Sequence, residues 1–147
     1  MKKIFTLLTI SVVLCGCATN MSQLQRRAIE SKELEGKFED AYKSTIQVFQ
    51  DCGYVIKNSD YQSGIIQGET GIKQSWLGTM INNEITATLE QFGDNMVKER
   101  ISLVRKTKIS SQYGTNEDSQ IVEDPELFQK IYEDIQKEMF VRRNLNK

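Results

Sequence analysis

The residues of this chain best suited to covalent chemistry are its three cysteines. Cys15 and Cys17 end a segment that begins with two lysines and continues as an apolar run from Ile4 to Val13, whereas Cys52 stands alone. The chain has no histidine, so a cysteine or serine nucleophile lacks its usual base and zinc lacks its commonest ligand. We therefore expect no enzyme, no metal and no cofactor other than a group attached to a cysteine.

The first residues have the parts of a secretion signal. A basic start, a short apolar run and the small Gly16 before Cys17 form the pattern that a signal peptidase reads. The run is too short to cross a membrane as a helix, which needs about 20 apolar residues. We predict a signal peptide over residues 1–16 and a mature chain that begins at Cys17.

The tetrapeptide Leu14-Cys15-Gly16-Cys17 resembles the lipobox of bacterial lipoproteins, with Cys15 at its tolerant second position. The resemblance implies that the Cys17 thiol carries a diacylglyceryl group and that two or three acyl chains make a lasting anchor, because each buried methylene contributes about 0.8 kcal/mol. Ala18, in place of a retaining Asp, implies the inner leaflet of the outer membrane, facing the periplasm, in a Gram-negative source. A Gram-positive source would place the protein on the outer face of the plasma membrane.

Cleavage leaves a small chain with one thiol and a nearly balanced charge. Loss of the two N-terminal lysines leaves 17 basic and 20 acidic residues, a formal charge of −3. This balance argues against nucleic acid as a partner, because nucleic-acid binding needs a dense positive surface. Once Cys17 is lipidated, Cys52 has no thiol with which to form an internal disulfide.

Two amphipathic helices and several strands are predicted along the mature chain. Apolar residues at helical spacing predict a helix from Phe38 to Cys52, which Gly53 ends. Asp124-Pro125 starts a second helix, with Asp124 as its cap and a buried stripe made of Phe128, Ile131, Tyr132, Ile135 and Met139. Strands are expected over residues 29–34, 54–57, 61–70, 84–92 and 96–109.

These elements indicate an α+β domain with the order β-α-β-β-β-β-α. We expect an antiparallel sheet of four to five strands with two helices packed on one face, because this arrangement buries both apolar stripes in two layers. The domain should occupy residues 29–147, after a lipidated flexible tether over residues 17–28. Residues 112–123 are polar without periodicity and should form a mobile loop.

A second resemblance is centred on residues 48–54, Val-Phe-Gln-Asp-Cys-Gly-Tyr, and on Gly64-Ile65-Ile66. Residues 25–142 resemble a family of small bacterial outer-membrane lipoproteins of largely unknown function. Their architecture is similar to the repeated domains of the C lipoprotein of the β-barrel assembly machine. The shared motifs are a helix stop, core residues and a strand glycine, so they imply a fold and no active site.

Three groups of side chains are candidate sites. Trp76, Leu77, Met80 and Ile81 are spaced as one face of a short helix or irregular connection, and they either cap the core or form an exposed contact for a partner or for lipid. Cys52 is expected to be packed in the core and therefore unreactive. The basic residues of strand 96–109 either attract anionic lipid head groups or an acidic partner, or protect a solvated edge strand; they are Lys98, Arg100, Arg105, Lys106 and Lys108.

The leading functional hypothesis is a non-enzymatic lipoprotein whose periplasmic domain binds another envelope protein. The alternative is a carrier that holds a small apolar ligand between sheet and helices, which requires a pocket of a few hundred Å³ there. A hydrolase ranks last, because the chain lacks the histidine that such a site most often uses.

Overall fold

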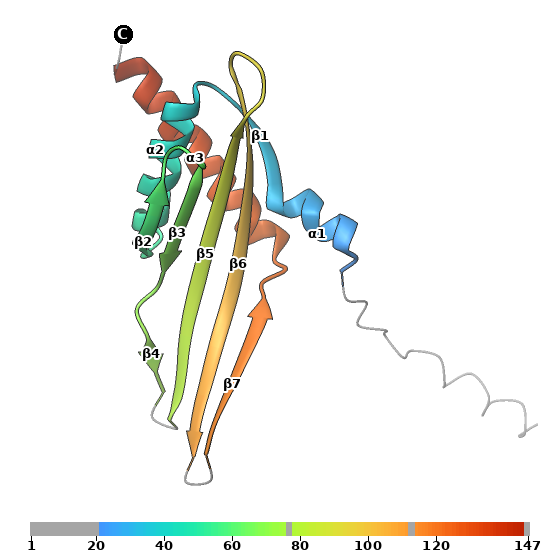
Figure 1. The fold of residues 1–147 in the computed structure, drawn as a ribbon, viewed down its shortest axis with the longest axis vertical. Coiled ribbons are helices and arrows are strands. Elements are labelled where there is room, and N and C mark those ends of the chain that lie inside the picture. Colours follow the sequence, from blue (N-terminus) through green and yellow to red (C-terminus); the bar gives the residue numbers. More distant parts are fainter. Residues whose placement is uncertain (1–20, 76–77, 112–113, 146–147) are drawn as a thin grey trace, which may run out of the picture.

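The computed structural model describes residues 21–75, 78–111 and 114–145. The chain has an α+β fold in which one antiparallel sheet of seven strands carries three helices (Figure 1). In chain order the elements are α1 (Gln23–Glu30), β1 (Ser31–Glu35), α2 (Phe38–Asp51), β2 (Val55–Asp60), β3 (Ile65–Glu69), β4 (Lys73–Gln74), β5 (Thr79–Gln91), β6 (Met96–Ser111), β7 (Gly114–Ile121) and α3 (Pro125–Leu145).

The long hairpin of β5 and β6 runs through the whole sheet, and each of its strands has two partners placed end to end. Along β6, β1 pairs with residues 96–100 and β7 pairs with residues 104–111. Along β5, β3 pairs with residues 84–88 and β4 with residues 80–81. The upper sheet therefore has the order β1-β6-β5-β3-β2, and a narrower lower sheet has the order β4-β5-β6-β7.

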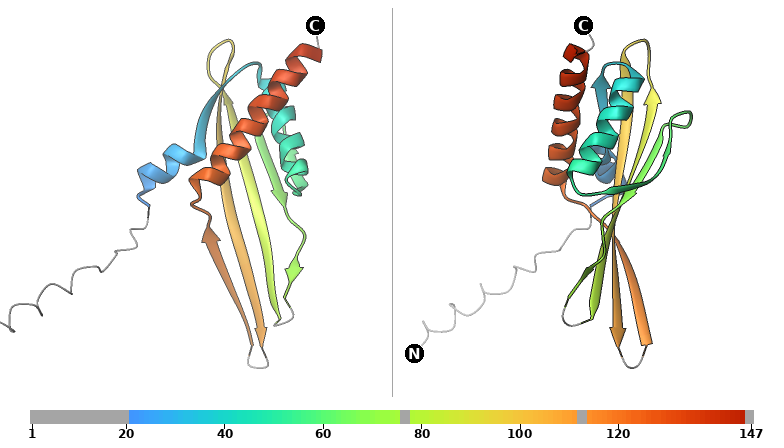
Figure 2. Two further views of the ribbon diagram at one scale, coloured as in Figure 1. Left: turned by 180° about the vertical axis from the view of Figure 1, so that it is seen from behind. Right: turned by 90° about the vertical axis from the view of Figure 1, so that its left-hand side faces the viewer.

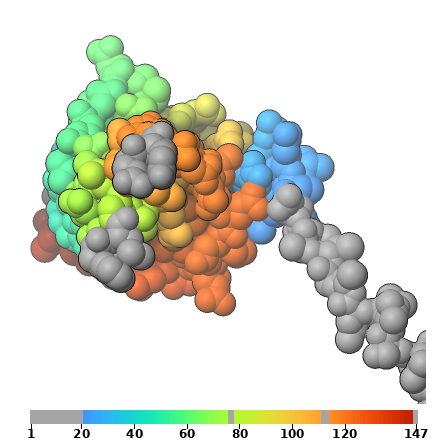
Figure 3. Space-filling model, turned by 90° about the horizontal axis from the view of Figure 1, so that it is seen from below, coloured from blue at the N-terminus to red at the C-terminus, as the bar shows by residue number. Residues whose placement is uncertain are grey.

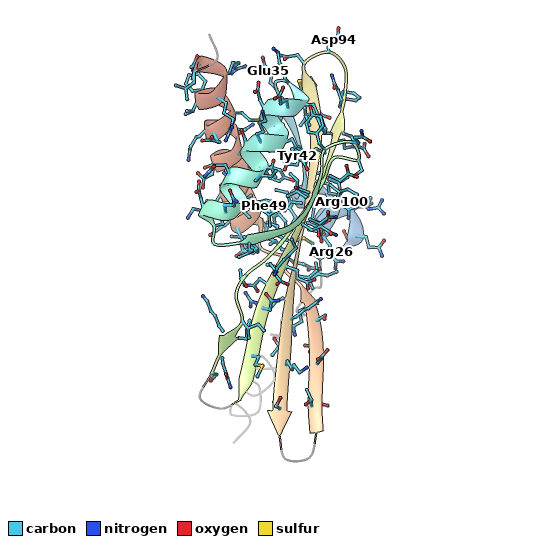
Figure 4. All side chains as sticks on the ribbon, turned by 60° about the vertical axis from the view of Figure 1, so that its left-hand side comes forward. Arg26, Glu35, Tyr42, Phe49, Asp94 and Arg100 are labelled. Carbon is cyan, nitrogen blue, oxygen red and sulfur yellow. The ribbon has the colours of Figure 1, made fainter. Side chains whose placement is uncertain are left out.

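Helices α2 and α3 cover one face of the upper sheet only (Figure 2, right). The core lies between these layers, and Tyr42 and Phe49 point from α2 toward the sheet (Figure 4). We call this helix-covered part the body. Its buried apolar residues are Leu34, Ala41, Tyr42, Val48, Phe49, Ile66, Ile85, Ala87, Leu89, Val97, Ile101, Leu103, Phe128, Ile131, Tyr132, Ile135 and Met139.

The end of α2 confirms the predicted helix stop. Gly53 has φ +86°, and its N–H donates to the carbonyl of Gln50 while the N–H of Tyr54 donates to that of Phe49, both at 2.9 Å. These two bonds form a Schellman motif, which satisfies carbonyl groups at the helix end. The rings of Phe49 and Tyr54 lie 6.1 Å apart, which supplies the apolar contact that accompanies this motif.

Helix α3 also starts as predicted. Asp124 Oδ1 accepts hydrogen bonds from the N–H groups of Glu126 and Leu127, at 3.1 and 3.2 Å. All five residues of the predicted stripe are buried. Both helices could be recognised in the sequence because their caps and their apolar spacing are local signals.

Gly64, in the turn between β2 and β3, lies at a close approach of two backbone segments. It has φ +69°, and a Cβ atom at this position would lie 2.1 Å from the carbonyl oxygen of Leu89. The neighbouring element is the backbone of β5, to which Gly64 is hydrogen-bonded at 2.8 Å. A side chain at this position would push the hairpin away from the sheet.

Three elements differ from the sequence prediction. The segment predicted as a tether contains α1, which begins at a capping box made by Ser22 and Gln25. The predicted loop over residues 112–123 contains strand β7, and β4 is a further short strand. The predictions of four to five strands and two helices were therefore too low, while the predicted α+β class and the two helices on one face of an antiparallel sheet are confirmed.

Candidate interaction surface

The lower sheet projects beyond the helices, and we call it the β arm. It comprises β4, residues 79–83 of β5, residues 105–111 of β6, and β7. None of the described residues of the β arm belongs to the buried core. Seen from the end of the β arm, lime β5 and orange β6 and β7 stand in front of the helices (Figure 3). Both faces of this sheet are therefore open to solvent or to a partner.

Apolar side chains lie on both faces of the β arm. Because successive residues of a strand point to opposite faces, Ile81 and Ile109 continue the face that the helices cover higher up, and they are 37% and 49% exposed. Met80 lies on the opposite face, where it lines a groove of about 340 Å³ together with Ile72. Lys106, Lys108 and Glu117 form part of the same groove. An apolar floor among charged groups is typical of a surface that binds a polypeptide.

The charges around this groove are paired. Lys108 Nζ lies 2.7 Å from Glu117 Oε1, and Lys106 forms an ion pair with Glu84. The hydrogen bond from Lys108 lowers the pKa of Glu117 below its usual value. All four side chains are at least one third exposed, so these pairs set the pattern of surface charge more than the stability of the β arm.

The interpretation of the basic strand as an edge was wrong. Strand β6 lies inside the sheet, with β5 on one side and β1 and β7 on the other. Lys98 and Arg100 alternate with core residues of the body, and several of the basic side chains have partners: Arg100 binds Glu30, and Arg105 Nε lies 3.4 Å from Asn83 Oδ1. The real edge next to this strand is β7, which carries Glu117 and Asp118.

The predicted contact group is only partly described. Trp76 and Leu77 lie outside the described residues, as does the predicted lipidation site Cys17. Met80 and Ile81 do not share one face of a short helix as their spacing suggested, because they belong to β5 and point to opposite faces of the β arm. Neither residue caps the core.

Cys52 was predicted to be packed in the core, and this was wrong, because its thiol is free and the residue is exposed. It lies three residues after the buried Phe49, but it is the C-cap of α2, after the last helical residue. Desolvation, with help from the negative charge of Asp134, still raises the pKa of the thiol. A raised pKa leaves little thiolate at neutral pH, and the thiolate is the reactive form, so low reactivity of Cys52 is still expected.

A buried carboxyl group, Glu99, is the main polar feature of the core. Thr45 Oγ1 lies 2.9 Å from the carbonyl oxygen of Ala41 and 2.8 Å from Glu99 Oε1. Thr45 Oγ1 donates to Glu99 Oε1, and this bond by itself lowers the pKa of the carboxyl group. Desolvation in this fully buried place has the larger effect and raises the pKa of Glu99 to about 8. The neutral acid is therefore the favoured form of Glu99 at pH 7.

A second buried glutamate joins α1 to the sheet and to α3. Arg100 Nε and Nη2 donate to Glu30 Oε2, at 3.2 and 2.9 Å, across the end of α1. Tyr132 Oη donates to the carbonyl oxygen of Glu30. Burial raises the pKa of Tyr132 above the ordinary tyrosine value. Arg26 of α1 forms an ion pair with Glu123, just before α3. These contacts fix α1 against the body.

Sequence analysis missed both buried glutamates, although one signal was present. Glu99 stands two residues from both Val97 and Ile101, so it lies on the same face of the strand and must point to the core. Its side chain is sealed from solvent, which gives it no route to a dissolved substrate. In the described ranges no three His, Cys, Asp or Glu side chains are grouped to hold a metal ion.

Within residues 21–75, 78–111 and 114–145, none of the helices combines the length and apolar character needed to span a bilayer. Comparisons with known proteins give no further indication of function. No protein-family model matches the chain, and no curated protein matches it at a significant level.

Proposed function

We propose that this chain is a non-enzymatic, lipid-anchored envelope protein that binds another envelope protein through its β arm. The observation that carries the proposal is the β arm itself, a four-stranded sheet that bears exposed apolar side chains on both faces and whose described residues contribute nothing to the core. Exposed isoleucines on an uncovered sheet lower the solubility of a free protein, so a binding role gives them a physical reason.

The anchor in this proposal is Cys17, lipidated after cleavage of residues 1–16, with Ala18 directing the protein to the inner leaflet of the outer membrane. Confinement to a membrane raises the effective concentration of the β arm near other membrane-bound proteins. Modest contacts are then sufficient for binding. The sequence resemblance to small outer-membrane lipoproteins supports the anchor and not the choice of partner.

The carrier alternative has weaker support. It requires a pocket between sheet and helices, but in the described residues this space is occupied by packed side chains such as Phe49, Ile101 and Ile135, each 0–1% exposed. The 340 Å³ groove lies on the β arm instead. A ligand held there would contact Ile72 and Met80 and remain open to solvent.

Site-specific photocrosslinking in intact cells tests the proposal. A photoreactive residue replaces Met80 or Ile81 of the β arm, and Gln62, in the exposed turn after β2, serves as the matched control. We expect the first two variants to crosslink the same protein and the control to crosslink none. Equal crosslinks at all three positions would contradict the assignment of the β arm.

The anchor needs its own test. Radiolabelled palmitate should enter the wild-type protein and not Cys17→Ser, and the crosslinks of the β arm should weaken in that variant. Labelling of the serine variant, or a purified product that still begins at Met1, would overturn the lipoprotein part of the proposal.

A further inference from the structure

The outer edge of β7 is the longest uncovered strand edge of the β arm. All eight residues of β7 are exposed, and in the described part of the chain its only strand partner is β6. At the top of this edge, the ion pair between Arg26 and Glu123 brings α1 close, so the open stretch ends near Ile121. An open strand edge is a template for one more strand.

The hydrogen-bond pattern shows which backbone groups of β7 face outward. The N–H of Val122 donates to the carbonyl of Leu103 at 2.9 Å, so Val122 faces β6. In an antiparallel ladder the direction of the backbone groups alternates along the strand. Residues 116, 118 and 120 therefore face β6, and the N–H and C=O groups of Thr115, Glu117, Ser119 and Ile121 face outward.

A second copy of the chain is a poor occupant of this edge. Two antiparallel copies of β7 must pair outward-facing residues with each other, which leaves two registers of nearly full overlap. One places Glu117 opposite Glu117 of the other copy, and the other places Asp118 opposite Asp118. Like charges directly opposite each other destabilise a strand pair. Both registers therefore work against self-association.

From this edge and its charge we infer that β7 accepts an extended segment of a different protein as an additional strand, one with lysine or arginine side chains opposite Glu117 and Asp118. Main-chain bonds to the four outward-facing residues provide affinity. The carboxylates of Asp118 and of Glu117, the latter shared with Lys108, select a basic segment over an acidic one. The exposed side chain of Ile121 offers an apolar contact at the end of the edge. The inference rests on the proposed binding function, and it specifies which strand edge binds the partner and which charge the partner segment carries.

The test uses the whole mature chain and two synthetic eight-residue peptides. One peptide has two adjacent lysines at its centre, flanked by threonine and valine, so that a lysine can lie opposite Glu117 and another opposite Asp118 on the other face; the other peptide has glutamate in place of each lysine. Amide hydrogen exchange is followed by NMR. We expect the lysine peptide to slow exchange at least tenfold at residues 115, 117, 119 and 121, with little change at 116, 118 and 120, which β6 already protects. The glutamate peptide should leave all seven amides unchanged.

Two variants sharpen the test. Ser119→Pro removes one outward donor and no bond to β6, so it should weaken binding of the lysine peptide at least tenfold, while Ser119→Ala binds like wild type. Asp118→Lys should weaken the lysine peptide and favour the glutamate peptide. Retained protection at 116, 118 and 120 shows that each variant still folds.

Equal binding of both peptides, or of Ser119→Pro and Ser119→Ala, would overturn the inference, as would absence of protection at millimolar peptide. Crosslinks from Met80 and Ile81 that persist in such a case would leave the proposed function standing and move the contact to the faces of the β arm.

Discussion

The body and the β arm are built on the same two strands, yet they differ in what covers them. In the body, β5 and β6 alternate buried and solvent-facing residues because α2 and α3 lie on one face. In the β arm, the same strands continue beyond the helices, and none of the described residues is buried. Burial thus depends on how far the helices extend along the hairpin, whose two strands remain paired in both regions.

The difference also separates two sources of stability. The body is stabilised by burial of apolar area, at roughly 25 cal/mol per Å². The β arm depends on ladder hydrogen bonds and on exposed ion pairs such as that of Lys108 with Glu117, which contribute little each. We expect the β arm to open locally more easily than the body, as suits a surface that rearranges around a partner.

Truncation of a core side chain should give the largest contrast between the regions. Phe49 is 0% exposed, so Phe49→Ala should lower the free energy of unfolding by about 3–5 kcal/mol. The matched change in the β arm is Ile109→Ala, at a residue 49% exposed, and it should cost less than about 1 kcal/mol. Urea unfolding measures both, and similar losses would remove the distinction between body and β arm.

The next largest effect concerns the buried acid of the body. The pKa of Glu99 is about 8 in the folded protein against an ordinary value of 4.5, so the folded state binds more protons between these limits. Stability should therefore fall as pH rises from about 4.5 to 8 and then level off. Each pKa unit corresponds to about 1.4 kcal/mol, so Glu99→Gln should be clearly more stable than wild type at pH 9.

Near pH 5 the same variant should match wild type, because the carbonyl oxygen of the glutamine amide can accept from Thr45 Oγ1 as the neutral acid does. Urea midpoints at pH 5, 7 and 9 provide the measurement. An advantage of the glutamine variant that is constant across pH would mean that Glu99 does not titrate in this range.

A smaller effect is expected at the start of α3. Asp124→Ala removes the oxygen that accepts from two free amides of the first turn, and it should cost about 1 kcal/mol. Asp124→Asn keeps the acceptor and serves as the control. Equal destabilisation by both substitutions would assign the effect to charge and not to capping.

The smallest effect should come from an ion pair of the β arm. Lys108→Ala breaks the contact with Glu117, whose side chain is 69% exposed, and should leave the urea midpoint unchanged. It should, however, raise the pKa of Glu117, because the hydrogen bond from Lys108 now lowers it. NMR titration of Glu117 detects this shift, and a clear loss of global stability would show that the β arm and the body unfold as one unit.

Prediction from the sequence succeeded where the signal was local. The end of α2 at Gly53, the cap at Asp124 and the buried stripe of α3 were predicted from spacing and residue type. Strand β7 was missed because a strand that is exposed on both faces has no apolar alternation. The prediction for Cys52 was wrong because helical spacing gives the direction of a side chain but does not show whether other elements pack against the end of the helix.

By itself, the sequence determined an α+β domain with two amphipathic helices over an antiparallel sheet, since caps and periodicities depend on neighbours a few residues away. Tertiary structure alone decided that β5 and β6 extend past the helices, that Glu99 is buried as a neutral acid, and that β7 forms an open acidic edge. These properties depend on which distant segments come into contact, and burial and pairing between distant segments exist only once the chain has folded.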